Sequence, residues 1–509
     1  MGSGVGLFDY DQDGWLDIVV GQGSRIPRDA SDGEHHALLY HNNHDGTFRE
    51  VANEAGVAFR GYAQGVAIGD VDGDGRDDLY LSGFNSCALY HNDGNGRFTD
   101  MTDRSGLRSS GRGWSSSCAF ADLDGDGDLD LFVVRYLADT VDAQGRPTAN
   151  CNALPGQIGY CPPRVFAPEP DGLYRNNGDG TFTDVTVESG IAKVDGNGLG
   201  LAIADLDDDG RPEIFVANDK TPNLLWHNRG NLKFEEVGLA WGVAYNESGD
   251  AMAGMGVAVG DADEDGRIDL IVTNFYEEGV TFYRNTGPGQ FEVATARSRL
   301  RLPTRSKLGF GTGLVDFDRD GKLDLFITNG HVNDVRPLRM PYQMTPQIFR
   351  NEGQGRFLDE SRGAGPYFQE LWLGRGAAFG DLDNDGDPDI VVSPNTGPPA
   401  LLRNEANVKN HALQLVLVAR GPKGQRVLNP VGTRVEWRQG DVRRVRVVAA
   451  GTSYLSRSDP RVTIGLGAEA GPSAVEVHWP SGRAEVFKDV APDRWLELNE
   501  GSGEPPARR

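Results

Sequence analysis

Long apolar runs are missing from this sequence of 509 residues. No stretch approaches the ~18 consecutive apolar residues that a membrane-spanning helix needs, so the sequence predicts no membrane span. Catalytic patterns are missing as well. Neither Gly-x-Ser-x-Gly nor His-Glu-x-x-His occurs, and no Cys–His arrangement is apparent. We therefore predict that the protein is not an enzyme.

Cysteine is scarce, with four residues and no Cys-x-x-Cys pair, which argues against structural zinc. Cys151 and Cys161 bracket the insertion CNALPGQIGYC, where a disulfide would hold together a segment with little core of its own. Free buried thiols are the alternative, and a Cys87–Cys118 pair is also open. A disulfide would indicate an oxidising compartment.

Positive charge is in deficit, because 50 Lys and Arg stand against 75 Asp and Glu, for a formal net charge of -25. The last hundred residues are slightly basic, so the deficit lies in residues 1 to 406. Such a surplus of acid would repel nucleic acid, and in a compact domain it would oppose folding unless cations neutralise it. We expect no nucleic-acid partner.

Turn-forming residues are abundant, with 69 Gly and 27 Pro. One unit of two parts recurs along residues 1 to 406. Its first part is a Gly- and Ala-rich strand, an acidic turn and a second apolar strand, as in GVAIGDVDGDGRDDLYLSG (65 to 83). Its second part is again strand, turn and strand, as in LYHNDGNGRFTDM (89 to 101). Two hairpins make a four-stranded sheet, and such sheets repeated radially are the blades of a β-propeller.

The acidic turn occurs seven times in phase with this repeat. The sequence therefore predicts an all-β fold: a seven-bladed β-propeller over residues 1 to 406, a small β-sandwich-like domain over residues 407 to 501, and a disordered tail over residues 502 to 509. The second domain is expected from short alternating strands such as LQLVLV and VEVHW.

Each acidic turn follows the pattern D-x-D-x-D-G-x-x-[D/E]. Carboxylates at positions 1, 3, 5 and 9 converge on one point, and the Gly at position 6 permits the sharp turn. Hard oxygen ligands in a flexible loop select Ca²⁺ over transition metals. An Asp-Gly hairpin turn without metal is the alternative for one match, whereas seven matches in phase favour up to seven Ca²⁺ sites. The predicted ligands are Asp9, Asp11, Asp13 and Asp17; Asp70, Asp72, Asp74 and Asp78; Asp122, Asp124, Asp126 and Asp130; Asp205, Asp207, Asp209 and Glu213; Asp261, Asp263, Asp265 and Asp269; Asp316, Asp318, Asp320 and Asp324; and Asp381, Asp383, Asp385 and Asp389.

Successive strands of a four-stranded blade run in alternating directions, and this alternation predicts which rim of the propeller remains for a partner. The acidic turn joins strands one and two, and the Asn-rich turn joins strands three and four, so both lie on one rim. The other rim then receives the irregular segments, where recognition usually takes place. These predicted loops are residues 21 to 37, 136 to 172, 238 to 254, 330 to 347 and 361 to 374. Half of the aromatic residues in those segments are expected to fill gaps between blades. These residues are Tyr136, Tyr160, Trp241, Tyr245, Phe275, Tyr276, Tyr342 and Trp372.

The histidines carry little signal. His41, His91 and His227 occupy one repeat position, where Arg stands in other copies, so a structural role is favoured. The pair His35–His36 lies near His41 and His44 and hints at a metal or acid–base site.

With these motifs in place, the chain resembles the cartilage acidic protein family, in which FG-GAP/VCBS-type repeats precede an ASPIC/UnbV domain. The C-terminal resemblance rests on NPVGTRVEW, AAGTSYLSRSDPRVTIGLG, VEVHWPSG and LELNEG. The insertion CNALPGQIGYCPP is similar to a feature of bacterial members. The resemblance implies an integrin-α-like propeller with calcium loops, in a secreted or surface protein. It implies no particular ligand.

The start of the sequence departs from the family, since Met1 directly precedes the first Gly-x-Gly. Blade seven also lacks a fourth strand after residues 401 to 404. We therefore expect that an N-terminal strand closes the ring, and that this sequence lacks its natural N-terminal segment, including any signal peptide. An open edge is the alternative.

Together these features predict a monomeric, calcium-stabilised protein of the extracellular space, periplasm or cell surface. It would bind an unknown protein or glycan through the face opposite the calcium loops. The alternatives are a carbohydrate-active enzyme of the calcium-propeller lyase kind, an accessory biosynthetic protein of the UnbV kind, and a purely structural protein.

Overall fold

A computed structural model describes residues 2–23, 35–138, 140–142, 148–406, 409–421, 424–440, 442–468 and 473–506. Strands dominate these ranges, and the helices are one turn long: α1 (Ala52–Ala55), α2 (Thr186–Ser189), α3 (Gly238–Trp241) and α4 (Arg301–Arg305). Single 3-10 turns lie at Leu107–Gly111, Pro163–Val165, Ile191–Lys193, Arg336–Leu338 and Pro366–Gln369. Within the described ranges, no helix has the length and apolar character needed to cross a bilayer.

The repeated segments fold as pairs of antiparallel hairpins, and each pair forms a sheet whose strands follow chain order. The second and third units are joined by a pairing of Phe84 with Trp114. The last unit has three strands among the described residues. The units are β1 (Val5–Phe8), β2 (Asp17–Val20), β3 (Leu38–Asn42) and β4 (Phe48–Glu50); β5 (Tyr62–Gly69), β6 (Asp78–Phe84), β7 (Ser86–Gly94) and β8 (Arg97–Asp100); β9 (Trp114–Ala121), β10 (Asp130–Leu137), β13 (Gly172–Asn176) and β14 (Phe182–Asp184); β15 (Gly198–Ala204), β16 (Glu213–Asn218), β17 (Leu224–Asn228) and β18 (Phe234–Glu236); β19 (Val257–Gly260), β20 (Asp269–Val272), β21 (Thr281–Gly287) and β22 (Gln290–Val293); β23 (Gly309–Val315), β24 (Asp324–Asn329), β25 (Gln347–Asn351) and β26 (Phe357–Asp359); and β27 (Gly374–Gly380), β28 (Asp389–Pro394) and β29 (Ala400–Leu402).

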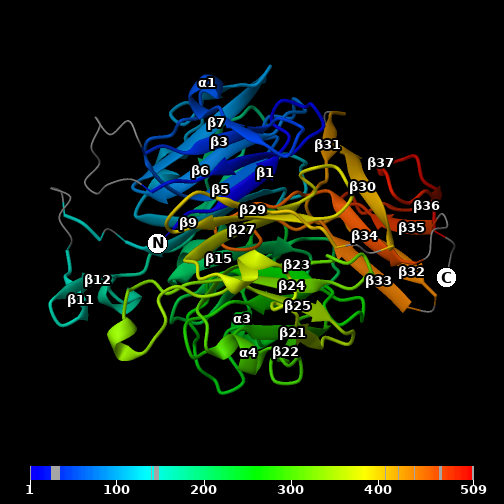
Figure 1. Cartoon of the computed structure of the whole chain (residues 1–509). Coiled ribbons are helices and arrows are strands. Elements are labelled where there is room, and N and C mark those ends of the chain that lie inside the picture. The colour runs from blue at the N-terminus through cyan, green and yellow to red at the C-terminus, as the bar shows by residue number, and fades with distance from the viewer. Residues whose placement is uncertain are drawn as a thin grey trace.

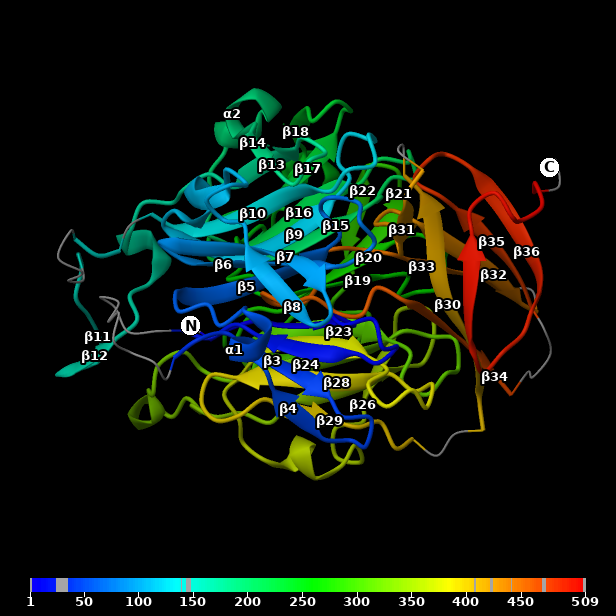
Figure 2. The ribbon, with the colours of Figure 1, turned by 90° about the horizontal axis from the view of Figure 1, so that it is seen from above.

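The units close into a ring, because the first strand of each contacts the first strand of the next and β27 contacts β1 (Figures 1 and 2). Glycine in these inner strands permits the close approach. A Cβ at Gly65 would lie 2.2 Å from the Ser116 carbonyl oxygen, and one at Gly200 would lie 2.0 Å from that of Met255. The predicted all-β, propeller-like class is confirmed.

One asparagine in the second hairpin of each unit ties neighbouring units together, a role that the sequence analysis missed. Asn176, for example, is buried and donates from Nδ2 to the Leu129 carbonyl of its own unit (3.0 Å) and the Val71 carbonyl of the preceding unit (2.7 Å). The same donation to the preceding unit recurs around the ring, and Asn42 closes it by donating to Leu382 (2.8 Å). We call these residues the latch asparagines: Asn42, Asn92, Asn176, Asn228, Asn285, Asn351 and Asn404.

We expect Asn176→Ala to lower the free energy of unfolding by about 2 kcal/mol, because two buried carbonyls lose their donor. Urea denaturation in calcium measures the change. Asn177→Ala is the matched control, since this neighbouring side chain is exposed and its hydrogen bonds among the described residues go to Thr181 and Thr183 of the same hairpin. Equal effects of the two substitutions would contradict the latch role.

The C-terminal part forms two four-stranded sheets that pack as a sandwich, with Leu413, Ile464, Val475 and Trp479 in its core. Its strands are coloured orange to red in Figure 1 and lie on one side of the ring. The predicted division of the chain at residue 406 stays a prediction. The first sheet contains β30 (His411–Arg420), β31 (Arg426–Leu428), β34 (Val462–Gly467) and β37 (Trp495–Asn499), and the second contains β32 (Arg434–Gln439), β33 (Val442–Val447), β35 (Ser473–His478) and β36 (Ala484–Val490).

The segment between β33 and β34 enters the centre of the ring, and we call residues 450–459 the plug. Ala450 and Ser453 exchange backbone hydrogen bonds with Ile203 and Val257, two residues of inner strands. Taken together, the hydrogen bonds of the plug reach the first strand of every unit, through Val5, Leu7, Val66, Ser117, Ile203, Val257, Thr312 and Phe379.

Candidate metal sites on one rim of the ring

The acidic turns share one backbone conformation. Position 4 has positive φ whatever its residue, from Gln12 (φ 61) to Arg319 (φ 54), and the Gly at position 6 follows with φ between 84 and 94. The carboxylate at position 1 accepts the amide of that Gly, as Asp9 does from Gly14 (2.9 Å) and Asp381 from Gly386 (3.1 Å). Each glycine therefore positions the first carboxylate, and the predicted need for Gly at position 6 is explained by its φ.

The acid at position 9 is buried in every turn and joins the two hairpins of its unit. Asp130, 1% exposed, accepts the Leu123 amide from its own turn and the Asn176 amide from the second hairpin. Glu213, the one glutamate in this role, does the same with Leu206 and Asn228. The acidic turn and the Asn-rich turn thus lie on the same rim, as predicted.

The carboxylates of a turn converge in the way that a cation site requires. In the first turn, ligand atoms of Asp9, Asp11 and Asp17 lie within 4.8 Å of one another. Buried Oδ1 atoms of Asp11, Asp316 and Asp381 have no hydrogen-bond partner among the described residues. Burying unpaired carboxylate oxygens is costly, and Ca²⁺ would satisfy them. The donor set fits a hard divalent cation, and all 28 predicted ligands lie in described turns of this kind.

Burial raises the pKa of the position 9 acids: to about 8 for Asp17 and Asp130 and to about 7 for Glu213. These values exceed the ~4 of an unfolded carboxyl, so without a cation the folded chain holds protons that the unfolded chain releases. Their stabilising contribution is fully present below the unfolded pKa and is lost as pH rises through the folded pKa.

We therefore expect the melting temperature in EDTA to fall between pH 5.5 and pH 8. With saturating Ca²⁺ this fall should be much smaller, because the cation replaces the proton. Paired melting curves across that pH range measure the difference. A fall of equal size with and without Ca²⁺ would contradict the assignment.

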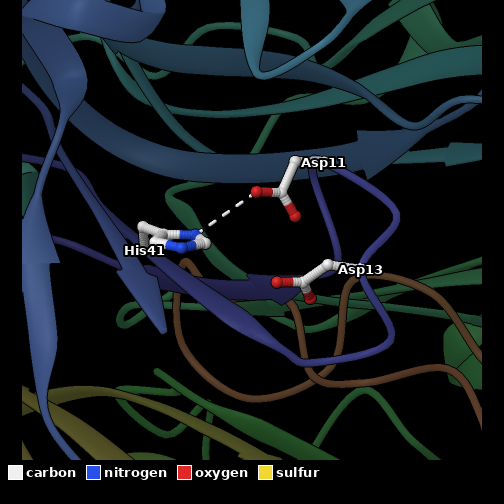
Figure 3. Close-up of side chains that lie close together, drawn as sticks. All are labelled: Asp11, Asp13 and His41. Carbon is white, nitrogen blue, oxygen red and sulfur yellow. Dashed lines mark ion pairs between the residues drawn. The ribbon is translucent and has the colours of Figure 1, made fainter. Parts of the chain in front are cut away.

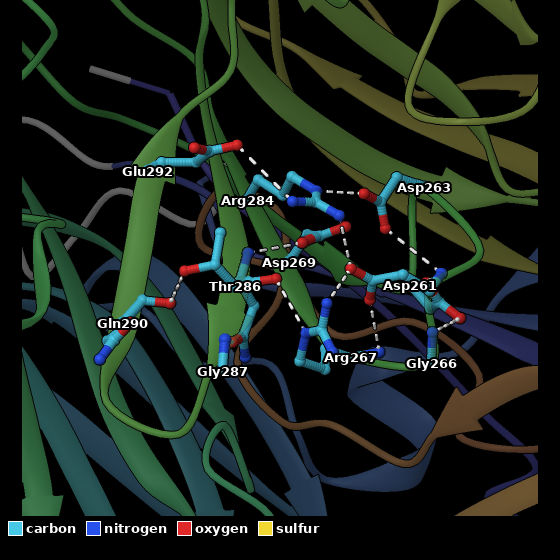
Figure 4. A network of polar contacts seen from close by, with 12 residues as sticks. Asp261, Asp263, Gly266, Arg267, Asp269, Arg284, Thr286, Gly287, Gln290 and Glu292 are labelled. Carbon is cyan, nitrogen blue, oxygen red and sulfur yellow. Dashed lines mark hydrogen bonds and ion pairs between the residues drawn. The ribbon is translucent and has the colours of Figure 1, made fainter.

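In five of the units the residue before the latch asparagine contacts carboxylates of its own turn. In the first turn His41 Nδ1 lies 3.3 Å from Asp11 Oδ2, with Asp13 beside it (Figure 3). In the fifth turn Arg284 takes this place. It pairs with Asp263, as Figure 4 shows, and also with Asp265. The sequence shows that these residues share one repeat position, but it does not show that their side chains point toward the carboxylates. His36 instead contacts the Ala37 carbonyl and Asn53, away from this group.

Arginines of the sandwich cover part of this rim. Arg434 pairs with Asp208 (2.5 Å), Arg444 with Glu264 (2.7 Å), and Arg446 donates to the Gly321 carbonyl (3.1 Å). Asp208 and Glu264 stand at position 4 of their turns, outside the predicted ligand set. A cavity of about 560 Å³ separates the sandwich from the first three turns.

The opposite face carries the hairpin of β11 (Cys151–Leu154) and β12 (Gln157–Gly159), which projects away from the sandwich (Figures 1 and 2). The predicted Cys151–Cys161 disulfide closes it, whereas the Cys87–Cys118 alternative is wrong because both thiols are free.

The aromatic residues predicted on the rim opposite the acidic turns differ in exposure and in position. Tyr160 is 49% exposed, whereas Tyr136 is buried. Trp241 lies 5.0 Å from the ring of His227 and therefore beside an acidic turn, not on the opposite rim. Parts of the predicted loops, residues 24–34, 139 and 143–147, lie outside the described residues.

In comparisons with known proteins, the repeats match one family model and the sandwich matches another. A family model described as FG-GAP-like repeat matches residues 9–81, 70–133, 165–216, 205–272, 261–327 and 316–392. A second model, described as ASPIC and UnbV, matches residues 425–505. Together with the ring of sheets, these matches define a class of protein: a propeller-like fold of FG-GAP-like repeats followed by an ASPIC/UnbV domain.

The chain belongs to this family, and its resemblance to the cartilage acidic proteins is confirmed. Cartilage acidic protein 1 of Homo sapiens is 24% identical over an alignment of 509 positions. The alignment covers 96% of this chain and 70% of the relative. The protein of that name from Xenopus tropicalis is 25% identical over 503 residues, covering 94% and 70%. The bacterial character stays a prediction.

Solved structures give weaker likenesses. An Agrocybe aegerita lectin that recognises non-reducing terminal N-acetylglucosamine is 19% identical, with a TM-score of 0.40 and coverage of 79% of this chain and 81% of its own. YCF48 bound to D1 peptide is 9% identical, with a TM-score of 0.43 and coverage of 79% and 92%. Neither likeness carries a functional argument.

Proposed function

We propose that this protein binds a protein or glycan outside the cytoplasm, through the face of the ring opposite the acidic turns, and that Ca²⁺ in those turns stabilises the ring. The proposal rests chiefly on one observation: the sandwich and its plug occupy the other face and the centre. The face that remains carries irregular segments on a rigid scaffold, the usual setting for recognition.

The hairpin of β11 and β12 is the most prominent feature of that free face. Ile158 is 80% exposed and Tyr160 49% exposed, and both lie on a segment closed by a disulfide. Tyr160 and Gln157 also anchor the hairpin to a neighbouring loop, through the Asn333 side chain (2.9 Å) and the Asp334 carbonyl (3.2 Å). Exposed apolar groups held on an ordered support are typical of binding surfaces, since little conformational entropy is lost on association.

The disulfide and the proposed calcium sites support an exterior location. Disulfides persist in oxidising compartments, and sites of the affinity typical of extracellular modules would be nearly empty at cytosolic calcium. A binding role, rather than a catalytic one, is proposed because the sequence contains neither Gly-x-Ser-x-Gly nor His-Glu-x-x-His.

A screen of the full chain against glycans and extracellular proteins, in Ca²⁺ and in EDTA, tests the proposal. We expect binding in Ca²⁺ and its loss in EDTA. For any ligand found, the double variant Ile158→Ser, Tyr160→Ser should weaken binding by about tenfold or more. The control is Leu428→Ser, Val442→Ser, which changes exposed apolar residues of the sandwich. If the control weakens binding and the hairpin variant does not, the ligand face is wrongly assigned.

A further inference from the structure

The position before each latch asparagine divides the units into two kinds. Histidine stands there in the first, second and fourth units, as His41, His91 and His227, and arginine stands there in the others, as Arg175, Arg284, Arg350 and Arg403. In five of the units a contact with carboxylates of the same turn is observed for this side chain, so the choice between imidazole and guanidinium changes the donor set that a cation would meet.

In two of the arginine units the guanidinium at this position pairs with carboxylates of the turn and would compete with a metal. Arg284 pairs with Asp263 and Asp265, and Arg403 lies 2.7 Å from Asp383 Oδ2. A guanidinium stays protonated and has no lone pair to offer, so these turns present oxygen donors alone. They suit hard cations.

In the histidine units a ring nitrogen joins the carboxylates, although in the second and fourth units an arginine at position 7 of the turn, Arg76 or Arg211, also pairs with the position 5 Asp. His91 Nδ1 lies 3.2 Å from Asp78 Oδ1 and 3.4 Å from Asp72 Oδ2. His227, which is 5% exposed, lies with Nδ1 3.0 Å from Glu213 Oε1 and 3.7 Å from Asp207 Oδ2. In each unit one imidazole and two Asp carboxylates place ligand atoms within 4.8 Å of one another.

The first unit extends this donor set. Asp11 Oδ1 is a buried atom that has no hydrogen-bond partner among the described residues. His41 Nδ1 is also buried and lies 3.3 Å from Asp11 Oδ2 and 3.5 Å from Asp17 Oδ1. A second imidazole, His44, reaches Asp13 Oδ2 with its Nε2 at 2.7 Å. His44 occupies a position of positive φ (64) that is Gly in most other units, such as Gly94 and Gly178. A bound metal would satisfy the Asp11 oxygen and could take the lone pair of a neutral His41 ring as a further ligand.

We propose that the histidine units are mixed nitrogen–oxygen sites for a transition-metal ion of the Zn²⁺ class, whereas the arginine units take hard cations only. Imidazole with carboxylate is a donor set that Zn²⁺ accepts readily, and transition metals bind nitrogen donors more strongly than Ca²⁺ does. The proposal rests on the acidic turns being cation sites and adds which turns accept which class of ion.

Titration of the full chain with Zn²⁺ in 1 mM Ca²⁺, followed by calorimetry, tests this inference, and Co²⁺ absorption reports the nitrogen ligands. We expect one Zn²⁺ per histidine unit. The combined variant His41→Arg, His91→Arg, His227→Arg should bind Zn²⁺ at least about tenfold more weakly. These replacements are residues that the chain already carries at the same position in other units, so the fold should accept them.

The converse variant Arg403→His should gain a Zn²⁺ site in the seventh unit. Melting curves in Ca²⁺ and EDTA for every variant separate the two proposals. If the calcium effect persists but Zn²⁺ binds wild type and combined variant equally, or binds neither, the assignment of the histidine units is overturned while the calcium proposal stands. If melting is insensitive to EDTA, the calcium proposal itself fails.

Discussion

Removal of divalent cations is expected to lower the melting temperature of this protein substantially. At a Kd of ~0.1 mM, typical of extracellular modules, ~1 mM Ca²⁺ would stabilise the folded state by ~1.4 kcal/mol per site. Seven occupied turns would contribute ~10 kcal/mol, comparable to the whole stability of an ordinary domain. The physical reason is the burial of acids such as Asp17 and Asp130, each of which lies close to other carboxylates of its own turn.

Differential scanning calorimetry in 1 mM Ca²⁺ and in excess EDTA measures this effect, with calcium-saturated EDTA as the control. Within one turn, Asp126→Asn should remove about one site's share of the stabilisation. Asp128→Asn changes the same charge at a position outside the predicted ligand set and should leave the Ca²⁺ dependence intact. An unchanged melting curve after chelation would refute a structural role for calcium.

The acidic turns could be predicted because everything that forms them is local. Asp9 to Asp17 spans one hairpin, the Gly at position 6 sets the turn, and the pattern recurs in phase with the strands. The rim on which these turns lie could also be predicted, because strands of alternating direction place the acidic turn and the Asn-rich turn at the same end of the blade. The hydrogen bond from the Asn42 amide to Asp17 confirms that the two turns are neighbours.

Contacts between distant residues could not be predicted in the same way. The latch role of Asn42 depends on the Leu382 carbonyl, 340 residues away in the sequence. The Asn itself, next to an Asn-rich turn, gives no sign in the sequence of a partner in another unit. The motif AAGTSYLSRSDPR marked the family, yet nothing in its residue pattern places it inside the ring. Its serines become informative only beside the inner strands, where the Ser453 hydroxyl accepts the Thr312 amide.

Shortening Tyr454 is expected to destabilise the whole chain, because this residue fills the centre of the ring. Tyr454 is 0% exposed, and its ring meets that of Phe310 edge-on at 5.0 Å between centroids. Removing a buried aromatic side chain of this kind costs about 3–5 kcal/mol. The plug bonds to the inner strand of every unit, so Tyr454→Ala should lower the stability of the ring and the sandwich together.

Calorimetry of Tyr454→Ala in saturating Ca²⁺ should show one transition at a lower temperature, with the sandwich tryptophans Trp437 and Trp479 exposed at the same temperature as the ring. Tyr454→Phe is the matched control. The Tyr454 hydroxyl has no hydrogen-bond partner among the described residues, so its removal should cost little while the ring packing is kept. If Tyr454→Ala melts the sandwich separately and leaves the ring at its wild-type temperature, the plug does not join the two parts energetically.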